Sequence, residues 1–221
     1  MLESRLNSEF LIYLTTNNYQ PGDRVPPLTT LKKELGLSIS KLREQLEAAR
    51  MLGVVEVKPR SGIRCANYEF FPAIKHSLLF GLALDNSLFT QFGELRNHIE
   101  ISFFSEAVQK LTRSDLLELD SLVLSAQEKL NGTPIRIPHN EHKDLHLNIF
   151  KKLENTFVLG LLEGYWEAYE AVDLNVYTDI QYLHKVWDYH KLIIQNLINN
   201  NIEGALDTFI EHTKLIDTRN Q

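Results

Sequence analysis

Hydrophobic residues recur at helical spacing along most of the chain, and only one short stretch departs from this pattern. Near the start, Leu2, Leu6, Phe10 and Leu14 follow one another every four residues and predict one apolar helix face. Two further helices are predicted at 28–35, which ends at Gly36, and at 40–52, which stops at Gly53. The β-branched stretch 54–57 and the stretch 63–65 flank the turn residues "KPRSG" and predict a small hairpin.

The remainder of the chain reads as helices throughout. The predicted spans are 68–84, 87–111, 113–131, 137–153, 155–173, 179–199 and 202–217. Ser114 and Asn155 are expected to act as N-caps. The fold class predicted is therefore mostly α, with an N-terminal domain of three helices and a hairpin at 1–66 and an all-α antiparallel helical bundle at 67–221.

Composition and charge are those of a globular protein with two unlike halves. The net charge of −6 over 221 residues divides into +3 for residues 1–66 and −9 for the rest. A basic head on an acidic body favours phosphate contact by the head alone. Apolar runs such as 77–84 are too short to span a bilayer, and the N-terminus lacks the apolar region of a signal peptide. With the single cysteine Cys65, these features predict a cytoplasmic protein without a membrane anchor.

The order helix, helix, tight turn, helix and hairpin is that of a winged helix-turn-helix, whose third helix can enter the major groove of DNA. Arg43 on that helix can offer two N–H groups to a guanine edge, while Ser38, Ser40 and Lys41 suit phosphates. The hairpin contributes Lys58, Arg60, Gly62 and Arg64, which could reach the adjacent groove. These side chains could equally be solvated charges on a small helical domain that mediates protein contacts.

Histidines cluster in the acidic body. His142 and His146 are four residues apart and share one helix face, a spacing by which a helix offers two imidazoles to one metal ion. His190 and His212 each lie among apolar residues of later helices, and a bundle could bring all of these rings together. The alternative is that each is a hydrogen-bonded core histidine. His139, next to Pro138, is interpreted as a bystander.

The first domain resembles the DNA-binding domain of the GntR superfamily of bacterial transcription regulators. The matching positions in "PGDRVPPLTTLKKELGLSISKLREQLEAARMLGVVEVKPRSGIRC" are Pro21, Gly22, Pro26, Leu31, Leu35, Gly36, Ser38, Arg43, Glu44, Leu46, Leu52, Gly53 and Gly62. The family carries arginines that usually touch DNA where this chain has Thr29 and Ile39. We expect Thr29 to stay at the DNA face, with fewer cationic contacts and an altered operator preference.

The second domain resembles the FCD ligand-binding domain of the FadR subfamily, an all-α bundle whose metal-binding members carry D-x-x-x-H and two later histidines. "HKDLH" matches the first element with His146 as its histidine, and His190 and His212 match the later ligands. His142 stands where the family has aspartate, so the resemblance implies a four-imidazole site for a divalent metal, most often Zn²⁺, with Ni²⁺ as a second choice. Arg96 matches the arginine of the family's "R..LE" helix and would point into an effector pocket, or else pair with Glu100 on the surface.

The resemblance implies a sequence-specific transcription regulator, expected to be a repressor and not an enzyme. Its expected partners are double-stranded operator DNA, a small carboxylate effector and a second copy of the chain in a homodimer. Three alternatives remain open: a regulator with a metal-free acyl-type effector, a helical metal-dependent enzyme, and an interaction module that has lost DNA binding. Tyr165, Trp166, Tyr169 and Trp187 could line the pocket, although core packing is the expected role.

Overall fold

The computed structural model describes residues 5–172 and 179–219, with side chains through 215, and it divides into two compact units. The units are Met1–Ser77 and Leu78–Gln221, and the division falls inside the helix α4, Phe71–Leu84. The predicted boundary after residue 66 stays a prediction. Leu2 and residue 173, which belonged to predicted helices, lie outside the described residues.

Three helices form the frame of the N-terminal unit: α1 (Glu9–Thr16), α2 (Leu28–Leu35) and α3 (Ile39–Met51). Ser8 and Ser38 cap α1 and α3, because each hydroxyl accepts a backbone N–H of the first turn. Gly36 ends α2 in the left-handed region at φ 67°, a conformation that glycine adopts without a steric penalty. α1 begins at Glu9, so Leu6 precedes the helix in which it was predicted.

A three-stranded antiparallel sheet completes this unit. Strands β2 (Val55–Lys58) and β3 (Gly62–Cys65) form the predicted hairpin, with Val55 opposite Cys65. A third strand that the sequence did not predict, β1 (Arg24–Val25), pairs with the other edge of β3. The buried side of the sheet joins the helices in one core, made of Phe10, Leu14, Val25, Leu31, Leu42, Ala49, Val55, Ile63 and Cys65.

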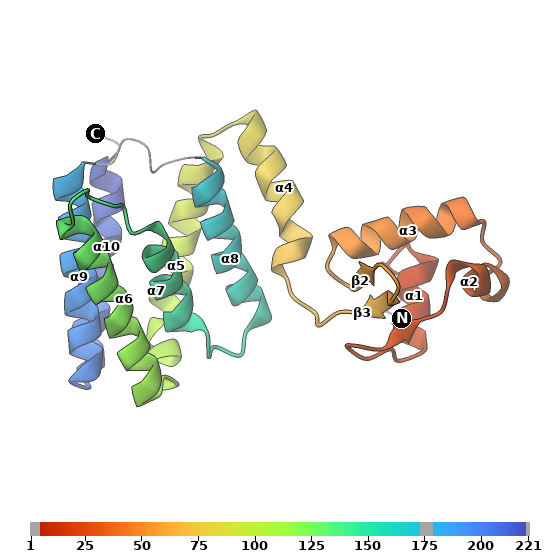
Figure 1. Ribbon diagram of the computed structural model, residues 1–221, viewed down its shortest axis with the longest axis horizontal. Coiled ribbons are helices and arrows are strands. Elements are labelled where there is room, and N and C mark those ends of the chain that lie inside the picture. Colours follow the sequence, from red (N-terminus) through yellow and green to blue (C-terminus); the bar gives the residue numbers. More distant parts are fainter. Residues whose placement is uncertain (1–4, 173–178, 220–221) are drawn as a thin grey trace. The chain divides into compact units, whose positions relative to one another are not determined.

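The second unit is a helical bundle. Its remaining helices are α5 (Leu88–Gln109), α6 (Arg113–Asn131), α7 (His139–Phe150), α8 (Thr156–Ala171), α9 (Ile180–Ile198) and α10 (Ile202–Arg219). α9 packs between α6 and α10, while α5 lies against α7, α8 and α10 (Figure 1). Among the described residues this unit contains no strand, which confirms the predicted all-α body.

The helices predicted from residue 68 onward agree with the observed ones to within three residues at each end. Asn155 caps α8 as predicted, since its side chain accepts the N–H of Val158. The prediction for Ser114 is wrong, because Thr112 is the N-cap of α6 and forms a capping box with Asp115. The apolar faces of these helices form a continuous core centred on Phe104, Leu119, Ile149, Trp187 and Phe209. None of the described helices is long and apolar enough to cross a membrane.

Candidate metal and effector site

Three helices of the bundle carry the four histidines. α7 contributes His142 and His146 one turn apart, α9 contributes His190, and α10 contributes His212. The helices meet because their apolar faces share one core, with Ile193 beside His190 and Phe209 beside His212. The four rings therefore converge, as the resemblance implied, and Asp144 points outward to solvent.

The ring nitrogens lie close to one another. One ligand atom from each of the four histidines falls within 4.8 Å of all the others. His190 Nε2 occupies the middle of the cluster, 3.2 Å from His146 Nε2 and 3.0 Å from His212 Nε2. The ring of His142 stacks edge-on to Trp166 with centroids 4.9 Å apart, and it lies 5.0 Å from the ring of His190.

Burial keeps these imidazoles neutral. His146, His190 and His212 are buried, and His142 is partly exposed at the edge of the cluster. The pKa of each of the four lies well below the ordinary histidine value, chiefly because burial penalises the charged ring. Nearby cationic groups, Arg96 among them, lower these pKa values further. Four neutral rings have their lone pairs available at neutral pH, the form in which histidine binds metals.

The arrangement fits a divalent metal better than a chain of imidazole hydrogen bonds. Zn–N bonds of about 2.0–2.1 Å separate two ligand nitrogens by about 3.3 Å in a tetrahedral site, close to the spacing around His190. His190 Nε2 carries either one N–H or one lone pair, so it cannot form good hydrogen bonds with both His146 Nε2 and His212 Nε2. The Nδ1 atoms of His190 and His212 are also buried without a hydrogen-bond partner among the described residues.

Arg96 and Glu100 of α5 form a buried pair beside this cluster. Arg96 Nε lies 2.6 Å from Glu100 Oε2, and their side chains are 3% and 0% exposed. Arg96 Nη2 lies 2.7 Å from His146 Nδ1, which is also 3.1 Å from Glu100 Oε1. Burial raises the pKa of Glu100 to about 7, against the opposing effect of Arg96. The sequence offered either a pocket position for Arg96 or a surface pair with Glu100; Arg96 does pair with Glu100, but in the interior.

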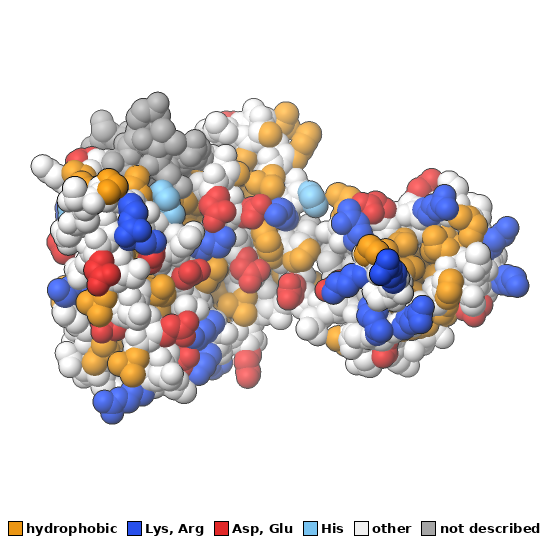
Figure 2. All heavy atoms as spheres, in the orientation of Figure 1, with side chains coloured by type: hydrophobic (Ala, Val, Ile, Leu, Met, Phe, Trp, Pro, Cys, Tyr) orange, Lys and Arg blue, Asp and Glu red, His pale blue; other side chains and the backbone are white. Residues whose placement is uncertain are grey.

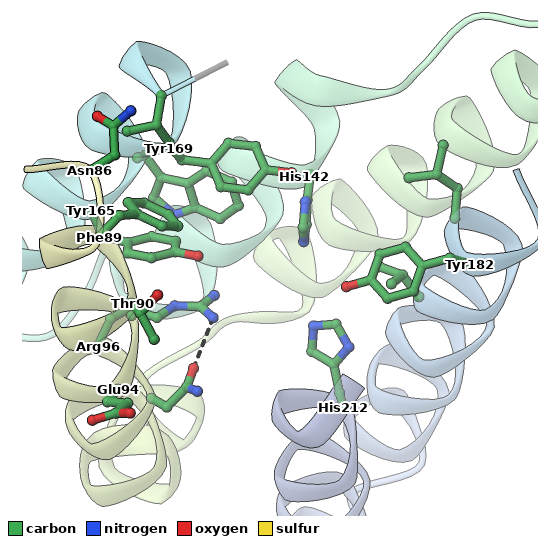
Figure 3. A pocket seen from close by; sticks show the side chains of 16 residues that line it. Asn86, Phe89, Thr90, Glu94, Arg96, His142, Tyr165, Tyr169, Tyr182 and His212 are labelled. Carbon is green, nitrogen blue, oxygen red and sulfur yellow. Dashed lines mark hydrogen bonds between the residues drawn. The ribbon is translucent and has the colours of Figure 1, made fainter. Parts of the chain in front are cut away.

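A cavity of about 280 Å³ opens next to the histidines. Its walls come from the start of α5, the end of α8 and the start of α9, and Arg96, His142 and His212 lie along it (Figure 3). In Figure 3 the guanidinium of Arg96 points across the cavity, with the rings of His142 and His212 on its far side. Arg96 Nη1 donates to Asn97 Oδ1 at 3.2 Å. A cation and two imidazoles therefore face one small space.

Aromatic residues form much of the remaining wall. Tyr165, Trp166 and Tyr169 of α8 line the cavity, and Tyr165 and Trp166 are also buried, so these two take both of the roles that the sequence offered. The guanidinium carbon of Arg96 lies 4.8 Å from the ring centroid of Tyr165 and 5.8 Å from that of Trp166, at cation–π distance. Trp187 is 2% exposed and belongs to the core, as expected. These rings hold Arg96 in position and exclude water from its stem.

In the N-terminal unit, the predicted DNA-contacting side chains of the helices are exposed. Ser40, Lys41 and Arg43 project from α3, and Thr29 projects from α2. Lys41 lies 3.6 Å from Glu44 on the same face. The hydroxyl of Ser38 is used for capping, since it accepts the N–H of Lys41 at 3.1 Å.

The wing gathers cationic side chains around its turn. Figure 2 shows Lys and Arg side chains over the hairpin, and the exposed residues there include Lys58, Arg60 and Arg64. Arg60 and Gly62 both have positive φ, 68° and 78°, which closes the turn tightly. Arg64 Nη1 donates to Gly22 O at 2.6 Å, so part of its capacity is used within the unit. Arg24, opposite Arg64 in the sheet, adds a cation that sequence reasoning had not singled out, because β1 is only two residues long.

A winged helix-turn-helix unit followed by an all-α bundle with a cavity that Arg96 lines is the architecture of one-component transcription regulators. The FCD domain description matches residues 91–215, more than half of the chain. The chain belongs to the FCD-domain family of GntR-type transcription regulators. It is a regulator rather than an enzyme.

Similar proteins agree with this assignment. HTH-type transcriptional regulator LutR of Bacillus subtilis (strain 168) is 31% identical over 97 residues, which cover 44% of each chain, less than half of either. The Uxu operon regulator of Haemophilus influenzae is 22% identical over 206 residues, covering 91% of this chain and 75% of the relative. The solved structure of Streptococcus agalactiae GntR has a TM-score of 0.66 at 20% identity, covering 97% of this chain and 96% of that one, and shows the same fold.

Proposed function

We propose that this regulator binds operator DNA as a homodimer and represses transcription, and that a small carboxylate bound beside a metal ion in the helical unit controls its grip on DNA. The observation that carries the proposal is the convergence of four imidazoles, two of which, those of His142 and His212, line the cavity that Arg96 also lines. The two elements suit the two ends of one interaction: a Lewis-acidic ion and a guanidinium for one carboxylate.

The four histidines would hold the ion, and their chemistry favours Zn²⁺, with Ni²⁺ as the second choice. An imidazole shell contributes no negative charge, so a divalent ion would keep its full charge toward the cavity. Imidazole ligands suit Zn²⁺, Ni²⁺ and Cu²⁺, whereas Mg²⁺ and Ca²⁺ prefer oxygen ligands. The bound ion would supply electrostatic attraction for a carboxylate; no reaction is required of it.

The size of the cavity favours a small effector over an acyl-type one. A volume of about 280 Å³ is just below the range for small-molecule pockets, about 300–1,000 Å³. A long acyl chain with a coenzyme A head would exceed it. The cation Arg96 and the hydroxyl-bearing rings of Tyr165 and Tyr169 suit a short polar acid better than a lipid.

DNA recognition would rest on α3 and the wing. These side chains are exposed: Arg43 would read a guanine edge, Ser40 and Lys41 would meet phosphates, and Lys58, Arg60 and Arg64 would approach the adjacent groove. Two copies related by a two-fold axis would read the two halves of a palindromic operator. The effector would act by binding more tightly to one arrangement of the dimer than to the other.

The metal part of this proposal is tested first by metal content. Untagged protein is analysed by mass spectrometry beside the double variant His190→Ala/His212→Ala, with His76→Ala as a control, because His76 is exposed on α4. The expected result is about one equivalent of a divalent metal in wild type and control, and none in the double variant. Absence of metal from all three, after dialysis against Zn²⁺ or Ni²⁺, would contradict a metal site.

The effector part is tested by DNA binding. The shift of DNA from the region upstream of the protein's own gene is measured at fixed salt, with a panel of small mono-, di- and hydroxycarboxylates and a panel of acyl-CoA esters. We expect a carboxylate to release DNA from wild type and to have little effect on Arg96→Lys. Release by an acyl-CoA ester alone would replace the carboxylate proposal with the metal-free acyl alternative.

A further inference from the structure

His146 has more close neighbours than a neutral imidazole can serve. Its Nδ1 lies 2.7 Å from Arg96 Nη2 and 3.1 Å from Glu100 Oε1. Its Nε2 lies 3.3 Å from the same Arg96 nitrogen and 3.2 Å from His190 Nε2. A neutral imidazole carries one N–H and one lone pair, so only two of these contacts can be full hydrogen bonds at once.

The chemistry of the neighbours leaves two arrangements. Arg96 can only donate, and Glu100, in the ionised form that pairs with Arg96, can only accept. If the lone pair of His146 is on Nδ1, Arg96 donates to it and the proton on Nε2 points to His190. If the lone pair is on Nε2, the Nδ1 proton is donated to Glu100. In both arrangements the lone pair lies within 3.3 Å of Arg96 Nη2.

A metal ion held by the histidine cluster needs that same lone pair, on Nε2. The ion and Arg96 are therefore competitors for one pair of electrons, and the positive charge of Arg96 adds to the competition. Glu100 acts in the opposite sense, because accepting the Nδ1 proton fixes the arrangement in which Nε2 is free to bind the ion. Hydrogen bonds of this kind orient histidine ligands in many metal sites.

We propose that Arg96 is a latch on His146 that metal binding releases, and that Glu100 is the positioning residue that favours the released state. Arg96 stays paired to Glu100 through Nε at 2.6 Å, so the released guanidinium remains in place with Nη2 free for a ligand in the cavity. This inference rests on the proposed metal and carboxylate site. It adds that metal loading itself frees Arg96 Nη2 for the carboxylate, before the carboxylate reaches the ion.

The latch predicts that weakening Arg96 strengthens metal binding. In Arg96→Lys the charge and the pair with Glu100 are retained, but the planar fork that reaches both Glu100 and His146 is lost. The Zn²⁺ affinity of untagged full-length protein is measured by competition with a fluorescent zinc chelator. We expect Arg96→Lys to bind Zn²⁺ about 10-fold more tightly than wild type. The reason is that the variant loses the charge-assisted hydrogen bond from Arg96 to His146, which competes with the ion.

Substitution of Glu100 should change the Zn²⁺ affinity in the opposite direction. Glu100→Gln keeps the shape of the side chain but offers an amide that can donate to Nδ1, which favours the arrangement without a free Nε2. We expect its Zn²⁺ affinity to fall about 10–100-fold, as for other hydrogen-bond partners of metal-binding histidines. Glu106→Gln is the matched control, because Glu106 lies on the same helix, is exposed and pairs with Lys110, away from the cluster. Its Zn²⁺ affinity should equal that of wild type.

The opposite signs separate this inference from simple damage to the fold, which would weaken binding in both variants. An unchanged or lower Zn²⁺ affinity in Arg96→Lys would overturn the latch while leaving the metal site intact. Zn²⁺ binding by Arg96→Lys but not by wild type would support it strongly. Absence of binding in every variant, Arg96→Lys included, would overturn both the latch and the proposed metal site. As a second readout, the nitrogen chemical shifts of the His146 ring should show the proton on Nδ1 in the Zn²⁺-loaded protein.

Discussion

His190 Nε2 and His212 Nε2 lie 3.0 Å apart in the interior of the bundle, although 22 residues separate them in the chain. The helices α9 and α10 that carry them pack along their length, so the approach of the two rings depends on the packing of the whole bundle. Local sequence cannot bring such a pair together.

Removing one of these rings should uncouple the stability of the protein from metal. In His212→Ala the ion loses a buried ligand, so added Zn²⁺ should no longer raise the unfolding temperature. In wild type a hundredfold excess of ligand over its Kd stabilises by about 2.7 kcal/mol. The measurement is thermal unfolding with Zn²⁺ and with chelator, and the control His76→Ala should behave as wild type. An equal response of His212→Ala and wild type to Zn²⁺ would count against His212 as a ligand.

Filling the cavity should increase stability at the expense of ligand binding. Gly93 lies inside α5 on the cavity wall, and a Cβ there would meet Tyr165 Cε2 at 3.9 Å, an ordinary contact. Gly93→Ala should raise the free energy of unfolding by about 0.5–1 kcal/mol, since alanine is the better helix former. It should also raise the carboxylate concentration needed to release DNA.

Gly81→Ala is the matched control for this prediction. Gly81 lies inside α4, where a Cβ would be 3.5 Å from Leu88 Cδ1, and it is not part of the cavity wall. This variant should gain stability without a change in the response to carboxylate. An equal rise in the carboxylate concentration needed to release DNA from both variants would show that the ligand binds elsewhere.

Asp115 should make the helical unit sensitive to acid. Its carboxylate accepts the N–H of Thr112 at 2.7 Å and pairs with Lys151 and Lys152, and these partners hold its pKa well below the ordinary value of 3.8. The folded state therefore binds this proton less readily than the unfolded state. The ionised carboxylate stabilises the fold fully above about pH 4, and this stabilisation is lost as the pH falls below that value.

The measurement is urea unfolding between pH 6 and pH 2. Asp115→Asn should be less stable than wild type at pH 6, and the difference should narrow as the pH falls below about 4. Asp144→Asn, at an exposed position of α7, should track wild type throughout. A constant difference between Asp115→Asn and wild type across the range would mean that its charge contributes nothing.

Gln45 should stabilise the DNA-binding unit through its amide. Its Oε1 accepts the N–H of Phe10 at 2.8 Å and the hydroxyl of Ser8 at 3.2 Å, which ties the start of α1 to α3. Gln45→Ala leaves these donors without a partner at a site that is 8% exposed, so it should cost about 1–3 kcal/mol. Hydrogen exchange at the α1 amides should accelerate more than exchange in the helical unit; uniform acceleration would contradict a local role.

Thr29→Arg should increase DNA affinity. The position is exposed on α2, and the resemblance to GntR DNA-binding domains implies that it corresponds to an arginine there. One additional phosphate contact in each subunit should steepen the salt dependence of log K by about 0.9 per contact. Thr30→Arg, at the neighbouring exposed position, controls for the added charge. Equal effects of the two variants would show that position 29 has no special approach to the phosphates.

The periodicity of apolar residues was sufficient to predict which parts of the chain form helices. The i, i+4 pair His142 and His146 was visible in sequence because both residues lie on one helix. His190 and His212 were candidates because each lies among apolar residues, and the resemblance added that they join this pair; no local rule predicts their proximity. The strand β1 was not predicted because two residues are too few to show the alternation of apolar and polar positions that is typical of a strand.

Glu100 marks the other limit of sequence reasoning. Its spacing from Arg96 is that of a surface ion pair, and spacing alone cannot distinguish a solvated pair from a buried one. The structure shows both side chains inside the bundle, with Glu100 against His146. Burial depends on which helices cover that face of α5, here α7, α8 and α10, and this is a property of the tertiary fold.

The histidine cluster also ties metal loading to the completeness of the fold. Three helices, α7, α9 and α10, must be packed before its four nitrogens come within reach of one ion, whereas an unfolded chain presents only the adjacent pair His142 and His146. The ion would therefore bind the folded bundle more tightly than the unfolded chain, and its binding free energy would add to the stability of the bundle. The ion would thus select against incompletely folded molecules, so that only chains whose C-terminal helix has docked enter the pool able to respond to a signal.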